Sequence, residues 1–115
     1  MTLDITKSLD IIETMENYIA KVRPRPEIRH QLDIGYEIKD QSIILQEIRP
    51  SWRNPTEIQR IGFAKTTFVK DKNIWKVFWQ RADLKWHSYE PKPTVKQLTD
   101  FLKLVDEDVH HCFKG

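Results

Sequence analysis

Leu32-Asp33-Ile34-Gly35-Tyr36-Glu37-Ile38 is the stretch that decides the fold class, because its large apolar side chains recur at every second residue. This period places them on one face of an extended chain, as in a β-strand with one buried face. Lys39-Asp40-Gln41 has the length and composition of a tight turn, and residues 42–49 continue as a second strand. We therefore expect two antiparallel strands joined by this turn.

Three more strands are expected after this pair. Pro50 ends the second strand, and residues 50–55 have the composition of a loop. Residues 60–70, 74–81 and 85–89 are rich in aromatic and β-branched residues and are separated by tight connections. Because short connections favour pairing between consecutive antiparallel strands, the five segments predict a meander.

Amphipathic helices are expected on both sides of the strands. Prolines 24 and 26 end the first helix, residues 5–22, and Thr94 is placed to cap the second helix with Gln97 closing a capping box. Apolar residues recur at helical spacing in both segments: Ile5, Leu9, Ile12 and Ile19 in one stripe, Ile11, Met15, Tyr18 and Val22 in a second, and Val95, Leu98, Phe101, Leu102 and Val105 near the other end. The order α-β-β-β-β-β-α predicts an α+β fold of two or three layers, an antiparallel five-stranded β-meander sheet flanked by an N-terminal and a C-terminal helix.

Composition narrows the class of protein. The chain has 115 residues, 39% hydrophobic and 31% charged, which is typical of one globular domain spanning residues 1–115. Its apolar runs are far shorter than the roughly 20 residues of a membrane helix. A single cysteine, Cys112, allows no internal disulfide. We therefore expect a cytoplasmic protein without a membrane contact.

Four stretches resemble a known family. They are residues 31–36, 47–52, 75–91 and 112–115, and the longest reads Trp-Lys-Val-Phe-Trp-Gln-Arg-Ala-Asp-Leu-Lys-Trp-His-Ser-Tyr-Glu-Pro. Together they resemble the bacterial family filed as domain of unknown function 3024, although Lys114 stands where an aromatic residue is expected before the final Gly. The resemblance implies a small bacterial intracellular protein and brings no established activity with it.

The densest candidate site lies in residues 75–89, where aromatic and basic side chains are interleaved. Aromatic residues occupy both faces of the fourth strand, so either each helix covers one face or one face is an open aromatic platform. An open platform flanked by cations suits single-stranded nucleic acid, whose bases stack on rings while Lys and Arg contact phosphates. The alternatives are packing within the sheet and a protein-binding groove. The residues in question are Trp75, Phe78, Trp79, Trp86 and Tyr89 with Lys76, Arg81, Lys85 and His87.

A second candidate site consists of basic residues in turns. Arg25 and Arg29 follow the first helix, and Arg49 and Arg53 flank Trp52. Tryptophan and arginine are enriched at binding hot spots; the alternative is that Trp52 folds back over the sheet edge and the arginines are solvated. Residues 21–90 carry fourteen Lys and Arg against nine Asp and Glu. We therefore expect a non-enzymatic module that binds nucleic acid, with a protein-interaction module as the alternative.

A second alternative is a nuclease-like enzyme that depends on Mg²⁺. Asp33 and the pattern Glu47-x-Arg49 resemble a nuclease arrangement in which two carboxylates hold Mg²⁺, but Arg49 replaces the lysine that helps to activate water. The alternative is an ion pair across the sheet surface. His87, His110, His111 and Cys112 are zinc-ligand types without the spacing of a zinc site. We therefore expect no metal and no cofactor.

Overall fold

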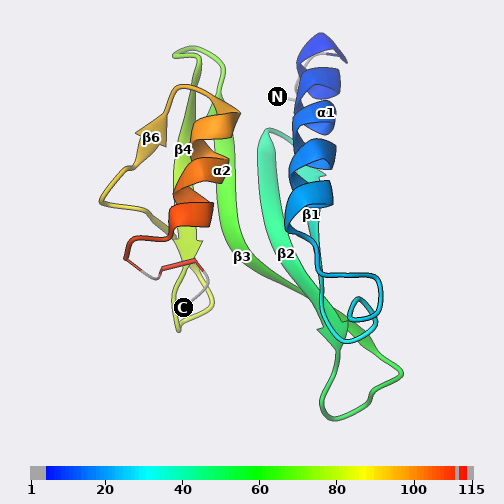
Figure 1. The fold of residues 1–115 in the computed structure, drawn as a ribbon. Coiled ribbons are helices and arrows are strands. Elements are labelled where there is room, and N and C mark those ends of the chain that lie inside the picture. The colour runs from blue at the N-terminus through cyan, green and yellow to red at the C-terminus, as the bar shows by residue number, and fades with distance from the viewer. Residues whose placement is uncertain (1–4, 111, 114–115) are drawn as a thin grey trace.

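The computed structural model describes residues 5–110, 112 and 113. It confirms an α+β fold in which a five-stranded antiparallel sheet lies between an N-terminal and a C-terminal helix in the chain (Figure 1). A sixth strand of two residues was not expected from the sequence. In chain order the elements are α1 (Ile5–Val22), β1 (Asp33–Lys39), β2 (Ser42–Pro50), β3 (Ile58–Val69), β4 (Ile74–Gln80), β5 (Trp86–Ser88), β6 (Thr94–Val95) and α2 (Leu98–Glu107).

The strands pair in sequence order from β1 to β5, which confirms the predicted meander. The outer edge of β4 is shared, with β5 opposite Phe78–Gln80 and β6 opposite Trp75 and Lys76. Between the two short strands, Tyr89 N–H donates to Val77 O at 2.9 Å, and Val77 N–H donates to Pro93 O at 2.9 Å. The chain therefore covers this edge along β4, and β1 forms the opposite edge of the sheet.

The second helix begins later than expected. Thr94, which was predicted to cap it, lies in β6, and Gln97 occupies the N-cap position of a helix that begins at Leu98. The prediction was wrong because Val95 pairs with Trp75 in the sheet and is buried there. Pairing with β4 thus outweighs the local capping signal. The backbone N–H of Gln97 donates instead to Oδ2 of Asp100 at 3.2 Å.

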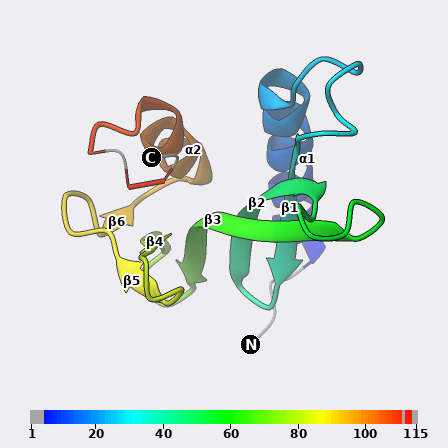
Figure 2. The same cartoon turned by 90° about the horizontal axis from the view of Figure 1, so that it is seen from below.

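Both helices cover the same face of the sheet (Figure 2). Met15 of α1 and Phe101 of α2 are completely buried with Leu45, Trp75 and Val77 from that face. The fold therefore has two layers, and no helix within the described residues lies on the other face. The sequence left open which aromatic side chains of β4 are covered. Trp75 and Trp79 belong to the face that packs in the core, whereas Phe78 projects from the face that no described helix covers.

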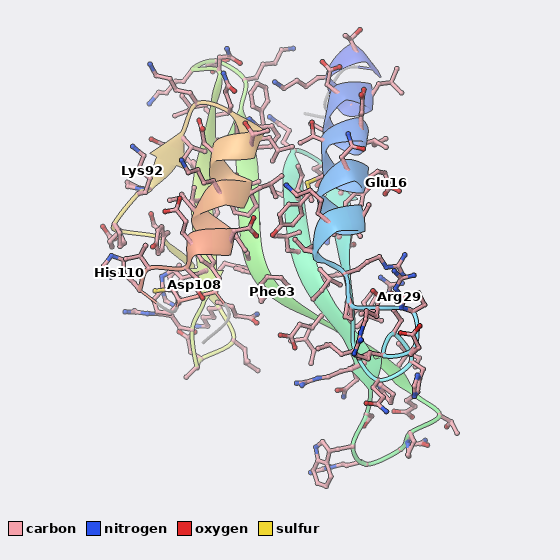
Figure 3. The ribbon with its side chains drawn as sticks, in the orientation of Figure 1. Glu16, Arg29, Phe63, Lys92, Asp108 and His110 are labelled. Atoms are coloured by element: carbon pink, nitrogen blue, oxygen red, sulfur yellow. The ribbon has the colours of Figure 1, made fainter. Side chains whose placement is uncertain are left out.

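A β-bulge in β3 bends the sheet around this core. Leu45 pairs with Ala64, but the next residue, Gln46, pairs with Gly62, so that Phe63 is an extra residue on β3. Phe63 is half-buried and packs against the core below the two helices (Figure 3). Beyond the bulge, the ends of β2 and β3 and their connection project past both helices, at the bottom of Figure 1.

Of the two predicted stripes of α1, one faces the core along its length, and the other packs against the core at Ile19 but not at Leu9 and Ile12. Ile11, Met15 and Tyr18 are buried, whereas Leu9 is 61% and Ile12 is 41% exposed. The hydroxyl of Tyr18 donates to Oδ1 of Asp106 at 2.7 Å and so links α1 to α2. Burial raises the pKa of Tyr18, and the bond to Asp106 raises it further. Among the described residues, no helix combines the length and the apolar character needed to cross a membrane.

Candidate nucleic-acid interface

The sheet face that the helices leave uncovered is called the open face below. Directly opposite residues of neighbouring strands project from the same face. The register therefore places one row of side chains across all five strands of the open face, and a second row at the end near the β3–β4 turn. The first row is Glu37, Ile44, Lys65, Phe78 and Ser88, and the second is Lys39, Ser42, Thr67 and Lys76.

Two aromatic rings and one lysine lie together in the middle of the open face. Nζ of Lys65 lies 5.6 Å from the ring centroid of Phe78 and 5.8 Å from that of Trp86. Both distances are within the range of attraction between a cation and an aromatic ring. Phe78 and Trp86 are half-buried, so part of each ring remains accessible to a ligand. The arrangement combines flat apolar surfaces with a positive charge between them.

Gly62 allows Trp86 to lie close to the sheet. A Cβ atom at this position would lie 3.1 Å from Cζ2 of Trp86 and 3.0 Å from Cγ2 of Ile44. The indole thus reaches across from β5 to the backbone of β3, and Ile44 contacts the same spot from β2. The aromatic platform is therefore supported from beneath by the backbone of β3.

A polar network borders the aromatic pair on the side of β1. Nε2 of Gln46 donates to Oε2 of Glu37 at 3.1 Å, and Nη1 of Arg60 donates to Oε1 of Gln46 at 3.4 Å. Every side chain in this network comes from a different strand. The network fixes Gln46, which is buried, and leaves the exposed guanidinium of Arg60 beside the platform.

The structure brings together only part of the residues predicted from positions 75–89. Lys76 projects from the open face, Trp86 lies on it, and Lys85 is exposed in the adjacent β4–β5 turn. Arg81 and His87 lie elsewhere. Trp79 projects from the face that the helices cover. The guanidinium of Arg81 is 5.2 Å from the ring centroid of Trp79, and His87 pairs with Trp79 in register. Arg81 and His87 are therefore on the covered face. His87 Nε2 also lies 2.9 Å from Oδ2 of Asp83.

The basic residues in turns lie away from the aromatic platform. Arg25 is exposed after α1, and Nε of Arg29 donates to the carbonyl of Pro24 at 2.8 Å in the same segment (Figure 3). Trp52 is 84% exposed in the β2–β3 connection, where the Arg53 guanidinium lies 5.1 Å from its ring centroid. The alternative in which Trp52 folds back over the sheet edge is therefore wrong.

Asp33 and Glu47 do not form a shared carboxylate site. Asp33 pairs in register with Ile48, and Glu47 with Ile34, so the two carboxylates project from opposite faces. Nη2 of Arg23 contacts Oδ2 of Asp33 at 2.6 Å, whereas Nη1 of Arg49 is 3.9 Å from Glu47. Burial alone raises the pKa of Asp33, but hydrogen bonds from Arg23 and from the Ile34 N–H, with the charges of Arg23 and Arg29, outweigh it and lower that pKa.

The described residues contain no group of three or more His, Cys, Asp or Glu side chains that could hold a metal ion. His110 contacts the ring of Tyr89 at a centroid distance of 6.4 Å, near the turn that follows Asp108 (Figure 3). Burial raises the pKa of the Cys112 thiol, and the charge of Asp108 adds to this effect, so the thiol stays protonated at neutral pH. His111 lies outside the described residues.

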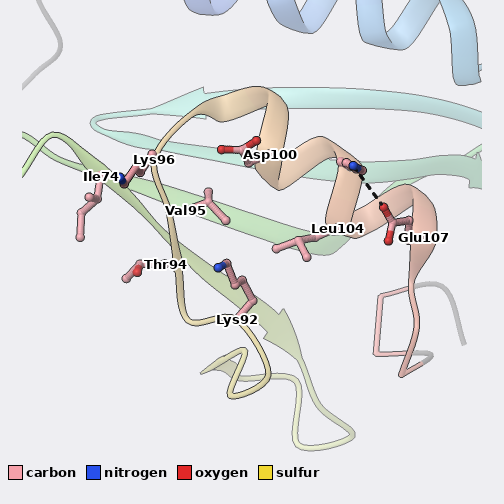
Figure 4. A pocket seen from close by; sticks show the side chains of 9 residues that line it. Ile74, Lys92, Thr94, Val95, Lys96, Asp100, Leu104 and Glu107 are labelled. Carbon is pink, nitrogen blue, oxygen red and sulfur yellow. Dashed lines mark ion pairs between the residues drawn. The ribbon is translucent and has the colours of Figure 1, made fainter.

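A groove of about 570 Å³ between β6 and α2 was not predicted from the sequence (Figure 4). Its apolar part includes Val95 and Leu104, and three lysines line it with two carboxylates. Lys103 pairs with Glu107 at 4.0 Å, so the charges largely balance and give little preference for an anion. The charged residues are Lys92, Lys96, Asp100, Lys103 and Glu107. The spacing of the last three along α2 is the signal that the sequence offered for this groove.

One comparison with known proteins gives a result. The family model described as a domain of unknown function, DUF3024, matches residues 4–115 of the chain. No curated protein and no solved structure matches the chain with significance.

Proposed function

The chain belongs to the DUF3024 family of domains of unknown function, and we propose that its open face binds single-stranded nucleic acid. The observation that carries this proposal is the accessible pair of Phe78 and Trp86 with Lys65 between them, on a sheet face that neither helix covers. Stacking of bases on aromatic rings and contacts between phosphates and cations are the two interactions that such a ligand needs.

Each side chain has a defined role in this proposal. Phe78 and Trp86 stack on successive bases, at about 1–3 kcal/mol for each base. Lys65 and Lys76 face the phosphates from the platform and from the row beside it, with Lys85 and Arg60 at its borders. Half-buried rings accept any base because every base has an apolar face, so the proposed binding has little sequence preference.

Fluorescence anisotropy of labelled oligonucleotides tests the proposal. Single-stranded DNA and RNA are expected to bind the full chain in the micromolar range at low salt and to dissociate as salt rises, because phosphate neutralisation releases counterions. Trp86→Ala and Phe78→Ala are expected to weaken binding by about tenfold each. Lys76→Gln is expected to weaken binding for all sequences and to reduce the salt slope by about one.

Lys103→Gln is the matched control for Lys76→Gln, because Lys103 is also exposed but lies on α2 over the covered face. Circular dichroism checks that each variant keeps its fold. Wild-type protein that binds no oligonucleotide at low salt contradicts the proposal. Binding that Trp86→Ala and Phe78→Ala leave unchanged contradicts the assignment of the open face.

The exposure of Trp52 favours a second function, which is binding of a partner protein at the β2–β3 connection. Exposed Trp beside Arg is the composition of an interface hot spot. Such an interface is expected to depend on the Trp52 ring and to change little with salt, whereas nucleic-acid binding weakens steeply with salt. A salt titration of any complex that the chain forms therefore separates the two functions.

A further inference from the structure

Three apolar side chains of α1 and of the edge strand β1 are exposed. Leu9 and Ile12 are the exposed members of their stripe on α1, and Ile38 is 36% exposed near the end of β1. These residues come from two separate elements, so no periodic pattern in the sequence relates them.

A hydrogen bond fixes how α1 and β1 lie against each other. The hydroxyl of Tyr36 donates to Oε2 of Glu16 at 2.6 Å, and Glu16 projects from the outer side of α1 (Figure 3). The helix and the strand run in opposite directions (Figure 1). Ile12 lies one helical turn before Glu16, about 6 Å away, and Ile38 lies two residues after Tyr36, about 7 Å away on the same face. Ile12 and Ile38 are therefore at the same height along the helix and the strand.

The exposed half of this edge carries one negative and one positive charge, which would face each other if two copies of the edge paired antiparallel. Glu37, Ile38 and Lys39 are exposed, whereas Asp33–Tyr36 are half-buried next to the segment that follows α1. If two such edges pair antiparallel around Ile38, Glu37 of each copy lies opposite Lys39 of the other. Pairing shifted to centre on Glu37 sets two carboxylates opposite each other. Opposite charges across a strand pair stabilise it and like charges destabilise it.

We infer that this edge is an interface between two copies of the chain. The two β1 strands pair antiparallel with the two-fold axis at Ile38, and the ladder forms from the backbone N–H and C=O groups on the outer edge of β1, which faces no other strand among the described residues. Ile12 and Leu9 of each copy then cover the two Ile38 side chains on the side of the helices. The pairing joins two sheets edge to edge and places both open faces on one side of the dimer. This inference does not depend on the proposed function.

Sedimentation equilibrium of the full chain over a range of concentrations tests the interface. We expect reversible dimerisation. Lys39→Glu creates two contacts between like charges and is expected to raise the dissociation constant by about tenfold or more. Glu37→Lys is expected to do the same. The double variant Glu37→Lys with Lys39→Glu restores opposite charges in the same register and is expected to return the constant to near the wild-type value.

Lys72→Glu is the control for net charge, since Lys72 is exposed in the β3–β4 turn, away from β1. Rescue by the double variant is the result that a fold defect does not produce. A wild-type chain that stays monomeric at sub-millimolar concentration overturns the inference. A dimer whose dissociation constant is the same in Lys39→Glu and in Lys72→Glu overturns this interface.

Discussion

The carboxylate of Asp33 forms an ion pair with Arg23. This pair joins the start of β1 to the residue that follows α1. Arg23 donates to both oxygens, at 2.6 and 3.2 Å, and the Ile34 N–H donates to one of them at 2.8 Å. Glu47, by contrast, is 3.9 Å from Arg49 in a partly exposed pair. The carboxylate that the sequence suggested as a metal ligand is thus a structural residue.

Asp33→Asn is therefore expected to lower the free energy of unfolding by about 1–2 kcal/mol at neutral pH. The pKa of Asp33 is lower in the folded than in the unfolded chain. The stabilisation is thus complete above the unfolded value of about 3.9 and is lost as pH falls through the folded value. Urea unfolding at pH 7, 5 and 3 measures this. Glu47→Gln is the control, with a change of at most about 0.5 kcal/mol. An Asp33→Asn deficit that persists undiminished in acid contradicts the assignment.

Gly62 is expected to be required for the position of Trp86. In Gly62→Ala the new methyl group meets Cζ2 of Trp86 and Cγ2 of Ile44, and the bulky indole has to move outward. We expect a loss of about 1–3 kcal/mol in stability and a shift in tryptophan emission. Gly35→Ala is the matched comparison, because its methyl group meets mainly Cδ1 of Ile48, the end of a flexible side chain. Equal losses in thermal or urea unfolding of the two variants contradict the proposed role of Gly62.

The alternation of residues along β4 predicted correctly which of its side chains share a face. It could not predict that Trp86 contacts Gly62, because that contact joins β5 to β3 across the bulge at Phe63. Local pattern determines the direction of a side chain, but only the register between distant strands determines its neighbour.

The start of α2 allows two effects to be told apart, the capping of a helix by a local side chain and the pairing of a strand with the sheet. Because Thr94 lies in β6, Thr94→Ala is expected to change stability by less than about 0.5 kcal/mol. Asp100→Ala removes the carboxylate that accepts the Gln97 N–H and is expected to cost about 0.5–2 kcal/mol. Chemical unfolding of both variants measures the difference. A larger loss in Thr94→Ala than in Asp100→Ala means that the helix begins at Thr94 after all.

The two stripes of α1 show a second limit of local pattern. Periodicity predicted the helix correctly, from residue 5 to residue 22. Both stripes are apolar, however, and only the packing of the core around Met15 decides that one stripe is buried while the other contacts the core at Ile19. Leu9 and Ile12 remain outside the core for this reason, and we infer a second copy at the edge of the sheet on their side.

At the scale of the whole molecule, the decisive fact is that both helices cover one face. The aromatic residues on the two faces of β4 raised this question, but the sequence contains no signal for the side on which a terminal helix packs. The packing is decided by long-range contacts of the core, such as those among Met15, Phe101 and Trp75. The residues of the candidate site could therefore be predicted from the sequence. Which of them are accessible to a ligand could not be predicted.

The open face also predicts how affinity depends on the length of the ligand. Arg60 and Ile58 continue the open face along β3 beyond Gly62. Ile58 lies about 13 Å from Gly62, and the exposed Trp52 lies in the β2–β3 connection, which precedes Ile58 in the chain. A ligand of about 4 nucleotides covers only the platform, whereas one of about 16 nucleotides, the upper end of known site sizes for small single-strand binding domains, extends to Trp52.

Trp52→Ala is therefore expected to weaken binding of the longer oligonucleotide by about tenfold and to leave binding of the shorter one unchanged, as measured by anisotropy. Trp52→Phe keeps an aromatic surface and is expected to preserve most of the affinity. Trp86→Ala is the reference, because it weakens both lengths alike. If Trp52→Ala affects neither length while Trp86→Ala affects both, the open face still binds nucleic acid. The β2–β3 connection then presents Trp52 and Arg53 to a protein, because an indole with this exposure beside a guanidinium retains the composition of a protein-binding hot spot.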